Sequence, residues 1–488
     1  MNHLLEESQL NQVFDKMKFQ TSAGCTAISS FFEILPKTKN IVTRRTNTIL
    51  SVKKSVNNQT DSLWKKAKAA EELLEPYIDN KTDLIGQAES QLFFTGEHTK
   101  ILNTVPYLIT ILLILKIWVA PIMGVMMPFM FFIAPYIIVK LVMKIPIPWE
   151  VYISIMKEMV LGVKGDQPIG LKQLSQGLYL VTSFGQGLIQ PILTAQQTYK
   201  TDLKIKEIGT AINEYIGTTA EIFTRLYQKD TLQKLPPLPL DLSARDAYWW
   251  FKDNHLLFKS WRHQVGCMDV YYTLAKDSAW RPVEWSSVAE FQFEGLADLC
   301  IKEPIKSDIV YNRHNLMTGP NRGGKSSFLR AVLQQVLFSR VLGITNCERA
   351  SLPWVHWIHS RIRSLDKPGE ASLFEEDVKS CAGILKRVDV AEHGLVLIDE
   401  LFHSTNPPDA LFCAQTFLGD FWKCESATSI ISTHSFELLN DLPEHVKTLC
   451  CPASEVDDGQ IKYSYKVEHG VCKLSSVREV LKEAGFRL

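Results

Sequence analysis

The chain has 488 residues, and its 53 basic and 53 acidic side chains cancel at neutral pH. This length exceeds a single hydrophobic core and predicts about two to four domains. The balanced charge provides no overall field that would draw the protein to nucleic acid or to an acidic membrane surface. The ten cysteines form no CxxC pair and the amino terminus lacks an apolar signal core. We therefore expect free thiols in an intracellular, reducing compartment, and no secretion.

The first unusual element in chain order is an apolar segment within residues 101–147. Residues 105–143 contain only two charges, Lys116 and Lys140, in a run of 39 residues. Divided at residues 121–128, this run gives two stretches, each close to the roughly 20 residues that a helix needs to cross a bilayer. One prediction is therefore a transmembrane hairpin whose flanking lysines mark the cytosolic side by the positive-inside rule. These lysines are Lys100, Lys140 and Lys144.

The same segment has a second interpretation, which the sequence leaves open. A pair of helices buried in a soluble core would also be apolar, and prolines inside a membrane span remove backbone hydrogen bonds that lipid cannot replace. Against this, a helix in a soluble core is rarely apolar on every face. The prolines in question are Pro106, Pro121, Pro128 and Pro135.

Helical periodicity dominates residues 148–235. Apolar residues spaced three and four apart between Ile205 and Leu226 form a heptad stripe, which predicts a long helix over residues 194–229. The proline-rich residues 235–239 cannot continue this helix and mark a domain boundary. Residues 236–299 are then expected to connect the helical region to the carboxyl-terminal domain.

Residues 319–326 read Gly-Pro-Asn-Arg-Gly-Gly-Lys-Ser, a complete G-x-x-x-x-G-K-[ST] motif before a predicted helix at residues 327–342. The glycines let backbone N–H groups turn toward phosphate oxygens. Lys325 is predicted to contact the β- and γ-phosphates and Ser326 to bind Mg²⁺, while the positive end of the helix favours an anion. Residues 300–488 are therefore predicted to bind ATP and Mg²⁺.

Two further apolar segments end in residues suited to catalysis. Residues 394–400 indicate a buried parallel strand that ends in Asp399 and Glu400. Asp399 is predicted to hold Mg²⁺ through its water shell, and Glu400 to polarise the attacking water. A second strand at residues 428–434 ends in His434, predicted to contact the γ-phosphate or to position the water. The predicted catalytic residues are Glu400, His434 and Lys325.

These motifs resemble those of the MutS family. The loop from Gly319 to Ser327 is similar to the phosphate loop of that family, and residues 397–400 with the polar loop 404–409 have the spacing of its Walker B motif and D-loop. Residues 432–438 resemble its histidine switch, and residues 372–374 its signature segment. The resemblance implies metal contacts from Ser326 and Asp399. It implies nucleotide contacts from Gly319, Pro320, Asn321, Arg322, Gly323, Gly324, Lys325, Ser326, Ser327, Ser372 and Asp409.

The resemblance also implies an assembly. Each site would be completed in trans by Ser372 and the loop that carries Asp409, in a dimer with itself or with a related subunit. Residues 1–100 are similar to the start of the MutS core domain, and residues 148–235 to its lever helices. Because the chain begins at the core-like segment, we expect it to have no mismatch-reading domain. MutS proteins usually have glycine at the positions of Phe402, Ser404 and Ala410.

The expected fold is an α/β ABC-class P-loop ATPase domain preceded by a mainly α-helical core and lever region. The expected activity is ATP hydrolysis in composite dimer sites, and two hypotheses remain for what it drives. The first is MutS-like DNA maintenance or mismatch repair, on mismatched or branched DNA. The second is a membrane-anchored mechanochemical ATPase that has lost DNA recognition, held through residues 105–143 with its ATPase domain in the cytosol.

Overall fold

The computed structural model describes residues 1–78, 92–94, 96–105, 107–161, 171–226, 239, 241–362, 373–388, 392–402, 404–456 and 460–486. The chain divides into two compact units, which we describe separately. Unit 1 comprises Met1–Lys65, Thr219–Leu235 and Ser260–Leu488, and unit 2 comprises Lys66–Thr218 and Pro236–Lys259. Helices make up the amino-terminal part of the chain and mixed α/β structure the carboxyl-terminal part, as predicted at that level.

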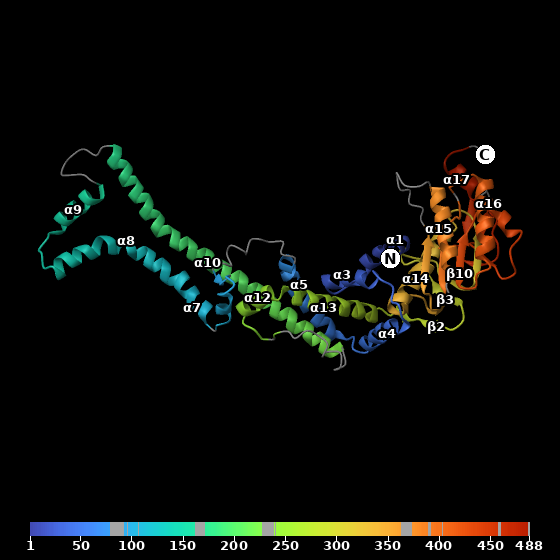
Figure 1. Cartoon of the computed structure of the whole chain (residues 1–488), viewed down its shortest axis with the longest axis horizontal. Helices are drawn as coiled ribbons and strands as arrows, with labels where there is room; N and C mark the ends of the chain where they lie inside the picture. Colours follow the sequence, from blue (N-terminus) through green and yellow to red (C-terminus); the bar gives the residue numbers. More distant parts are fainter. Residues whose placement is uncertain are drawn as a thin grey trace. The chain divides into compact units, whose positions relative to one another are not determined.

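Unit 1 contains a six-stranded sheet with the strand order β14-β11-β5-β10-β9-β8. Figure 1 labels β10, one of its central strands. Its strands are β5 (His314–Thr318), β8 (Trp357–Arg361), β9 (Gly394–Ile398), β10 (Ala427–Ser432), β11 (Lys447–Cys450) and β14 (Glu468–His469). β14 is antiparallel to β11, and the other neighbours are parallel. Every residue of β5, β9 and β10 is buried, as expected for central strands covered on both faces. The strands predicted near residues 394–400 and 428–434 are β9 and β10.

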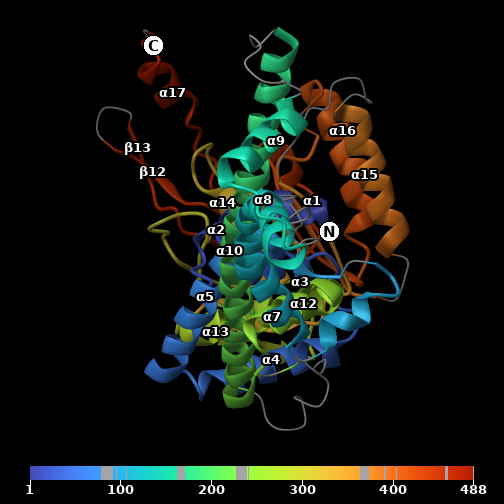
Figure 2. The same ribbon diagram turned by 90° about the vertical axis from the view of Figure 1, so that its left-hand side faces the viewer.

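Three helices cover this sheet: α14 (Lys325–Leu342), α15 (Leu373–Val388) and α16 (Pro407–Phe421). Figure 2 shows α15 and α16 side by side. Their apolar faces form one core with the sheet, in which Ile384 and Phe421 are buried together with Val396. α14 begins two residues earlier than the helix predicted at residues 327–342, directly after the glycine-rich loop.

Shorter elements complete this α/β part of unit 1. A four-stranded sheet has the order β2-β7-β3-β4, and two pairs, β1-β6 and β12-β13, stand apart from it. These strands are β1 (Arg281–Pro282), β2 (Glu284–Ser286), β3 (Glu290–Leu296), β4 (Ser307–Asn312), β6 (Ile344–Thr345), β7 (Arg349–Pro353), β12 (Ala453–Val456) and β13 (Gln460–Tyr463). The 3-10 helix η4 (Phe436–Leu439) and α17 (Val477–Glu483) follow β10 and β14. The connection from β3 to β4 matters most, because it forms part of the site below.

The amino-terminal helices of unit 1 pack against α14. They are α1 (Asn2–Ser8), α2 (Leu10–Lys16), α3 (Ser22–Phe31) and α4 (Lys39–Lys53), with parts of α5 (Asn58–Ile78) and α13 (His255–Lys276). Phe32 is fully buried, and its ring lies 5.1 Å from the rings of both Phe14 and Phe338. Aromatic packing of this kind couples the helical part of the unit to the helix that follows the glycine-rich loop.

Unit 2 is helical in the part that the structure describes. Besides parts of α5 and α13, it contains η1 (Lys100–Thr104), α7 (Leu108–Ile114), η2 (Leu115–Val119), α8 (Ala120–Ile137), η3 (Ile138–Val142), α9 (Trp149–Leu161), most of α10 (Leu171–Leu226) and α12 (Ala244–Asp253). α10 has 56 residues and begins well before the helix predicted at residues 194–229. Arg245 of α12 contacts both carboxylate oxygens of Asp202 on α10, at 2.6 and 2.9 Å.

The predicted turn within residues 121–128 is wrong. The chain stays helical from Leu108 to Val142, through two π-helical segments, η2 and η3. The wider π turn of η2 lies just before Pro121 and relieves the clash between a proline ring and the carbonyl four residues earlier. Lys100 and Lys140 therefore lie near opposite ends of one long helix, and the prediction that both mark the same side of a membrane is also wrong.

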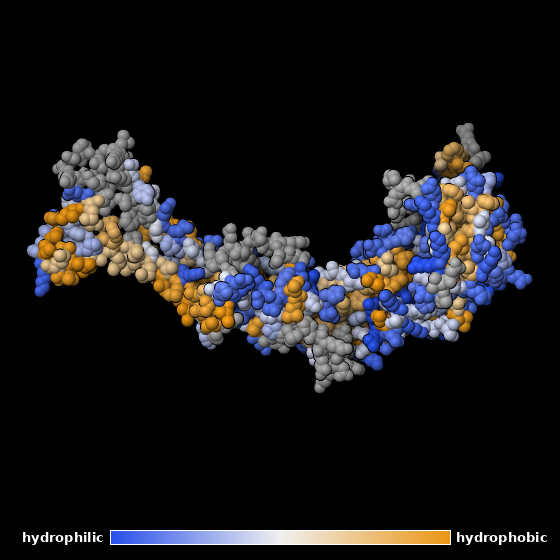
Figure 3. Space-filling view, in the orientation of Figure 1, coloured by the Kyte–Doolittle hydropathy of each residue, from blue (hydrophilic) through white to orange (hydrophobic). Residues whose placement is uncertain are grey.

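The apolar segment is not a buried helical pair either. Residues Leu108–Met127 form a helix of 20 residues with a mean hydropathy of 2.3, and only 11% of its most apolar window is buried. It is the one helix, among the residues described, that is long and apolar enough to cross a membrane, and Met130–Val142 continues as a shorter apolar stretch. Figure 3 shows apolar side chains gathered on the surface of this part of unit 2.

Candidate functional site

The loop between β5 and α14 has a backbone that only glycine adopts easily. Gly319 and Gly324 have φ angles of 145° and 104°, which L side chains rarely adopt. A Cβ atom on Gly319 would also lie 3.2 Å from the Cβ atom of Cys451. α14 begins at Lys325 without a side-chain cap. The backbone N–H groups of its first turn are therefore donors available to an anion.

The side chain of Lys325 turns back into the glycine-rich loop that precedes α14. Its side chain is buried, and its Nζ atom donates to the carbonyl oxygens of Gly319 at 2.8 Å and Pro320 at 3.2 Å. Burial lowers the pKa of Lys325 from its ordinary value, while the nearby carboxylates of Asp399 and Glu400 oppose that change. The loop thus holds a cation within reach of the acids that follow β9.

Ser432, the last residue of β10, fixes those two acids. Its hydroxyl donates to Oδ1 of Asp399 at 2.5 Å and accepts from the backbone N–H of Glu400 at 2.8 Å. Glu400 has a φ of 57°, a left-handed conformation that is strained by about 1–3 kcal/mol and is concentrated at functional sites. Ser432 is the first residue of the segment that resembles the histidine switch, but the sequence did not predict that its hydroxyl bridges the two acids.

His434 lies between the lysine and the second acid. Its Nε2 atom is 3.4 Å from Nζ of Lys325 and 2.9 Å from Oε1 of Glu400. One ring nitrogen cannot accept from the lysine and donate to the glutamate at once. The tautomer of His434 therefore decides which of the two groups Nε2 binds. The structure brings the three residues predicted to be catalytic into contact.

A pocket of about 500 Å³ opens over the loop. Residues 320–327 line one side, and the β3–β4 connection from Leu296 to Ser307 lines the other, together with Tyr465. The Tyr465 ring comes within 3.8 Å of the position that a Cβ atom on Gly324 would take. This second wall was not predicted from the sequence, because residues 296–307 and Tyr465 belong to no motif and Tyr465 is remote from both the connection and the loop along the chain.

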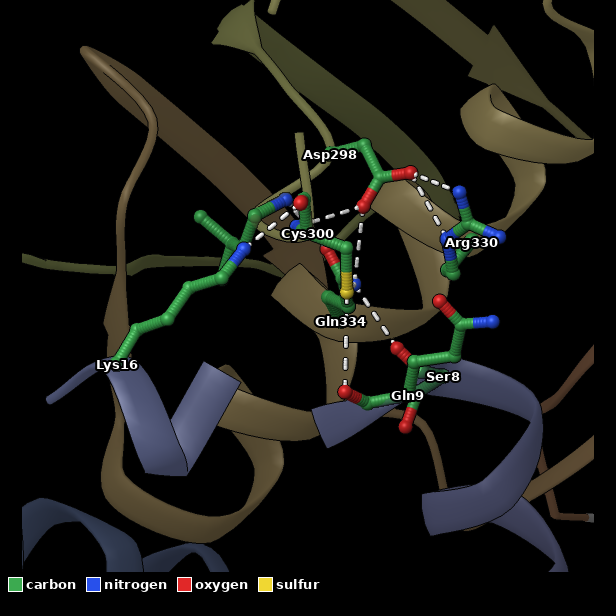
Figure 4. A network of polar contacts seen from close by, with 8 residues as sticks. Ser8, Gln9, Lys16, Asp298, Cys300, Arg330 and Gln334 are labelled. Atoms are coloured by element: carbon green, nitrogen blue, oxygen red, sulfur yellow. Dashed lines mark hydrogen bonds and ion pairs between the residues drawn. The ribbon is translucent and has the colours of Figure 1, made fainter. Parts of the chain in front are cut away.

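The second wall is fixed by a polar network centred on Asp298 (Figure 4). Asp298 accepts from Nε and Nη2 of Arg330, at 2.8 and 2.5 Å, and from Nε2 of Gln334 at 3.2 Å. Gln334 also donates to the carbonyl oxygen of Ser8 at 2.9 Å, and Lys16 donates to that of Cys300 at 2.7 Å. The network therefore ties the pocket wall to α14 and to the amino-terminal helices α1 and α2.

Phe402 occupies one of the positions where the MutS resemblance leads us to expect glycine. Its φ is 57°, a value that favours glycine. Its side chain is nevertheless buried in the core between the sheet and α15, with the Phe374 ring 6.2 Å away. Apolar burial of a large side chain, at about 1.5–3 kcal/mol, is comparable in size to the strain of this backbone conformation.

Among the predicted nucleotide contacts that the structure describes, Gly319 and Asp409 are not part of the pocket lining. Ser372 falls outside the described residues. Asp409 is exposed in the first turn of α16, where the Asn406 side chain accepts from its backbone N–H at 3.0 Å and donates to its carboxylate at 2.7 Å. Asp409 is thus held in a defined, outward position, and the roles of Ser372 and Asp409 stay predictions.

Comparison with known proteins identifies the domain that carries this site. The family model described as MutS domain V matches residues 315–487. "DNA mismatch repair protein MutS" of Thermus thermophilus is 33% identical over 172 residues, which is 35% of this chain and 21% of that protein. The proteins of the same name from Streptococcus sanguinis and Streptococcus agalactiae are 29% identical over 175 residues and 27% identical over 193 residues.

The match covers only part of this chain and only part of each relative. It covers 35% and 38% of this chain in the two streptococcal comparisons, and 20% and 22% of those relatives. The chain therefore spans about a fifth of the length of the curated relatives it matches. The matched residues include the glycine-rich loop, Asp399, Glu400 and His434, so the MutS resemblance predicted from those motifs is confirmed over residues 315–487.

Proposed function

We propose that residues 300–488 form an ABC-class P-loop ATPase that hydrolyses ATP with Mg²⁺. The observation that carries the proposal is the contact between Lys325, His434 and Glu400 at the glycine-rich loop, with distances of 3.4 and 2.9 Å. Lys325 is a cation that can bind phosphate, and Glu400 is a carboxylate that can accept a proton from water. With the His434 imidazole between them, these groups suit phosphoryl transfer to water.

The residues of the site fit both ligands. The Ser326 hydroxyl and the Asp399 carboxylate are the hard oxygen donors that Mg²⁺ prefers, and Ser326 is exposed in the pocket. The pocket volume of about 500 Å³ is within the usual range for small-molecule sites. Its apolar wall, which includes Ile301, Ile305 and Tyr465, suits a flat heterocyclic base. Bound Mg²⁺ would neutralise charge on the phosphates.

The chain's own groups then have distinct roles. Lys325 exchanges the two loop carbonyls for phosphate oxygens, because a charged acceptor binds an ammonium group more strongly than a neutral one. Glu400 takes a proton from water as the water attacks. His434, released from Lys325 when the lysine turns to phosphate, contacts Glu400 alone and holds its carboxylate in position.

The proposal includes a dimer, with itself or with a related subunit. Asp409 is exposed and does not line the pocket of its own chain, while Asn406 holds it rigidly at the start of α16. This arrangement supports a contribution from Asp409 to the site of a partner, together with Ser372. Each site would then be complete only when two subunits meet.

Two targets are proposed for the work of the ATPase. DNA maintenance is the first, because the relatives are named DNA mismatch repair proteins. A membrane-anchored mechanochemical ATPase is the second, and a specific observation favours it: only 11% of the most apolar window in the helix from Leu108 to Met127 is buried. In that case dimer closure would act on a membrane or on a membrane protein.

The test is ATP turnover by the full-length protein in detergent and in lipid vesicles, with mismatched, branched and fully paired DNA as additions. We expect hydrolysis that chelation of Mg²⁺ abolishes. Stimulation by mismatched or branched DNA alone would favour the first target, and stimulation by vesicles without a DNA effect would favour the second. A protein that neither binds nor hydrolyses ATP under these conditions would overturn the proposal.

A further inference from the structure

We propose that unit 2 crosses a lipid bilayer twice, outward through α7, η2 and α8 and back through the amino-terminal half of α10. The inference rests on the membrane-anchored form of the proposed function and specifies it. It differs from a hairpin confined to residues 105–143, because the return span is a segment more than 30 residues further along the chain.

Exposure distinguishes the first span from a helix of a soluble core. Ile122, Trp118 and Met127 are 60%, 66% and 65% exposed. Neighbouring exposed residues such as Met126 and Met127 point about 100° apart on a helix. The apolar surface is therefore wider than the single stripe of about 100° that an amphipathic helix buries against one partner. The interior of a lipid bilayer would surround the helix with apolar groups and so cover this wide surface.

Two contacts fix the register between the first span and α10. Arg245 bridges the helices at one level, because it binds Asp202 and also donates to Oγ1 of Thr110 at 3.1 Å. At a second level, a Cβ atom on Gly124 would lie 2.7 Å from Cγ of Pro191. The chain advances by 14 residues from position 110 to 124, and α10 returns by 11 residues from position 202 to 191. The two helices are therefore antiparallel neighbours.

Each of the two helices contains a long run without charged residues, and the two runs define a common apolar layer, called the slab below. Residues 117–139 of the first span contain none, and residues 173–199 of α10 contain none. The antiparallel register places these two runs at overlapping levels along the helix pair. The shorter has 23 residues, or about 34 Å at the helical rise of about 1.5 Å, close to the roughly 30 Å of a hydrocarbon core. Lys116 and Lys200 bound the slab on one side, and Lys140 and Lys172 on the other.

The far end carries the residues that favour a membrane interface. The Tyr136 ring lies 4.7 Å from that of Trp149 and 5.1 Å from that of Tyr152. Nζ of Lys140 donates to the hydroxyl of Tyr136 at 3.1 Å. Tyrosine, tryptophan and lysine concentrate where acyl chains meet headgroups. This cluster begins within the last residues of the charge-free run 117–139, where the register ends the slab.

The return span depends on the first one. α10 is less apolar, with Gln186 and Gln190 exposed within its charge-free run, and side chains of this kind disfavour insertion of a lone helix. Gly124 allows close approach of the two backbones, since the carbonyl oxygen of Gly187 lies 3.6 Å from its Cβ position. Small residues at such crossings are the usual basis of helix pairing in lipid. The two spans would therefore insert as a pair.

The test is cysteine accessibility in sealed vesicles that expose the ATPase domain. The ten native cysteines all lie outside residues 101–199, so each new cysteine adds one polyethylene-glycol maleimide increment over the wild-type chain. The variants are Met126→Cys and Ile189→Cys at mid-depth, Lys200→Cys at the near edge and Glu158→Cys beyond the far edge. We expect Lys200→Cys to be labelled at once and Glu158→Cys only after the vesicles are opened. The two mid-depth variants should be labelled only in detergent.

Each other outcome overturns the inference in a distinct way. Labelling of Ile189→Cys with protection of Met126→Cys would leave a single span, and labelling of both would make the apolar helix a protein-docking surface. Labelling of Glu158→Cys in sealed vesicles would mean that the chain does not reach the other side. The same four variants in a Glu400→Gln background should give the same pattern, so that a failure of the proposed ATPase would not be mistaken for a failure of the spans.

Discussion

The two units contain opposite exceptions to the rule that apolar groups are buried and polar groups exposed. In unit 1, Lys325, Asp298 and His314 are buried, and each has hydrogen-bond partners. In unit 2, the helix from Leu108 to Met127 leaves apolar side chains exposed. Buried polar groups with partners mark a preorganised site in an aqueous domain. An exposed apolar surface of this extent marks a site of contact with a protein partner or with a membrane.

The largest expected effect belongs to the site of unit 1. Glu400→Gln should lower ATP turnover by about 10²- to 10⁴-fold, the usual contribution of general-base catalysis, while ATP binding remains because Lys325 and the loop are unchanged. Steady-state turnover and equilibrium nucleotide binding measure the two quantities. Lys325→Ala, in contrast, should lose binding itself.

A matched control for that prediction is Glu425→Gln. Its side chain is 79% exposed and pairs with Arg313 at 3.3 Å, far from the loop in sequence. This variant should keep both binding and turnover. Undiminished multiple turnover by Glu400→Gln would remove Glu400 from its proposed role and weaken the contrast between the units.

The second prediction concerns assembly of the same site. Ser372→Arg and Lys325→Ala should each be inactive alone and recover activity when mixed, because a mixed dimer keeps one intact composite site. Equal mixing in a two-fold dimer should restore about a quarter of wild-type turnover. Absence of recovery at every mixing ratio, with mixed dimers demonstrated by differential tags, would exclude shared sites.

The third prediction tests the buried polar groups of unit 1 through pH. Burial lowers the pKa of His314 from its ordinary value to about 4. The folded state therefore favours the neutral form of the ring. Its contribution to stability is complete above about pH 6.5 and is lost as pH falls toward 4, by about 3 kcal/mol at 1.36 kcal/mol per pKa unit. The difference in unfolding free energy between wild type and His314→Gln should shrink over that range.

A constant difference between pH 7 and pH 4.5 would contradict that assignment. Acid unfolding of other groups affects both proteins and cancels in the comparison. The hydrogen bonds that His314 makes to Oγ of Ser429, at 2.9 Å, and to the carbonyl oxygen of Cys424, at 2.8 Å, explain why the ring is held although burial disfavours its charge.

The smallest expected effect lies in the helix pair of unit 2. Gly124→Leu should destabilise it by about 1–3 kcal/mol, the usual penalty for overpacking, because a side chain there meets Pro191. Gly185→Leu is the matched control, since nothing lies within 4 Å of its Cβ position. Thermal unfolding in detergent should show a lower midpoint for Gly124→Leu only. Equal midpoints would mean that the two helices are not in close contact.

Local chemistry determined most of the candidate site. The spacing of Gly319, Gly324 and Lys325 predicted a loop and helix, and the apolar runs before Glu400 and His434 predicted two buried strands, because these features depend on a few consecutive residues. The pocket wall around Tyr465 and the bridging hydroxyl of Ser432 were not predictable in this way. Both depend on which strands and loops lie beside one another, and no local pattern encodes that arrangement.

The same distinction between local and tertiary information applies to the apolar segment. Its composition by itself predicted helices within residues 105–143 and an almost complete lack of charge, since those properties belong to the side chains. Only the tertiary structure decided that the helix continues past Pro121, that its surface is exposed, and that its neighbour is α10. A proline lowers helix stability but cannot by itself say whether a π turn will accommodate it, and a partner 60 residues away is chosen by packing.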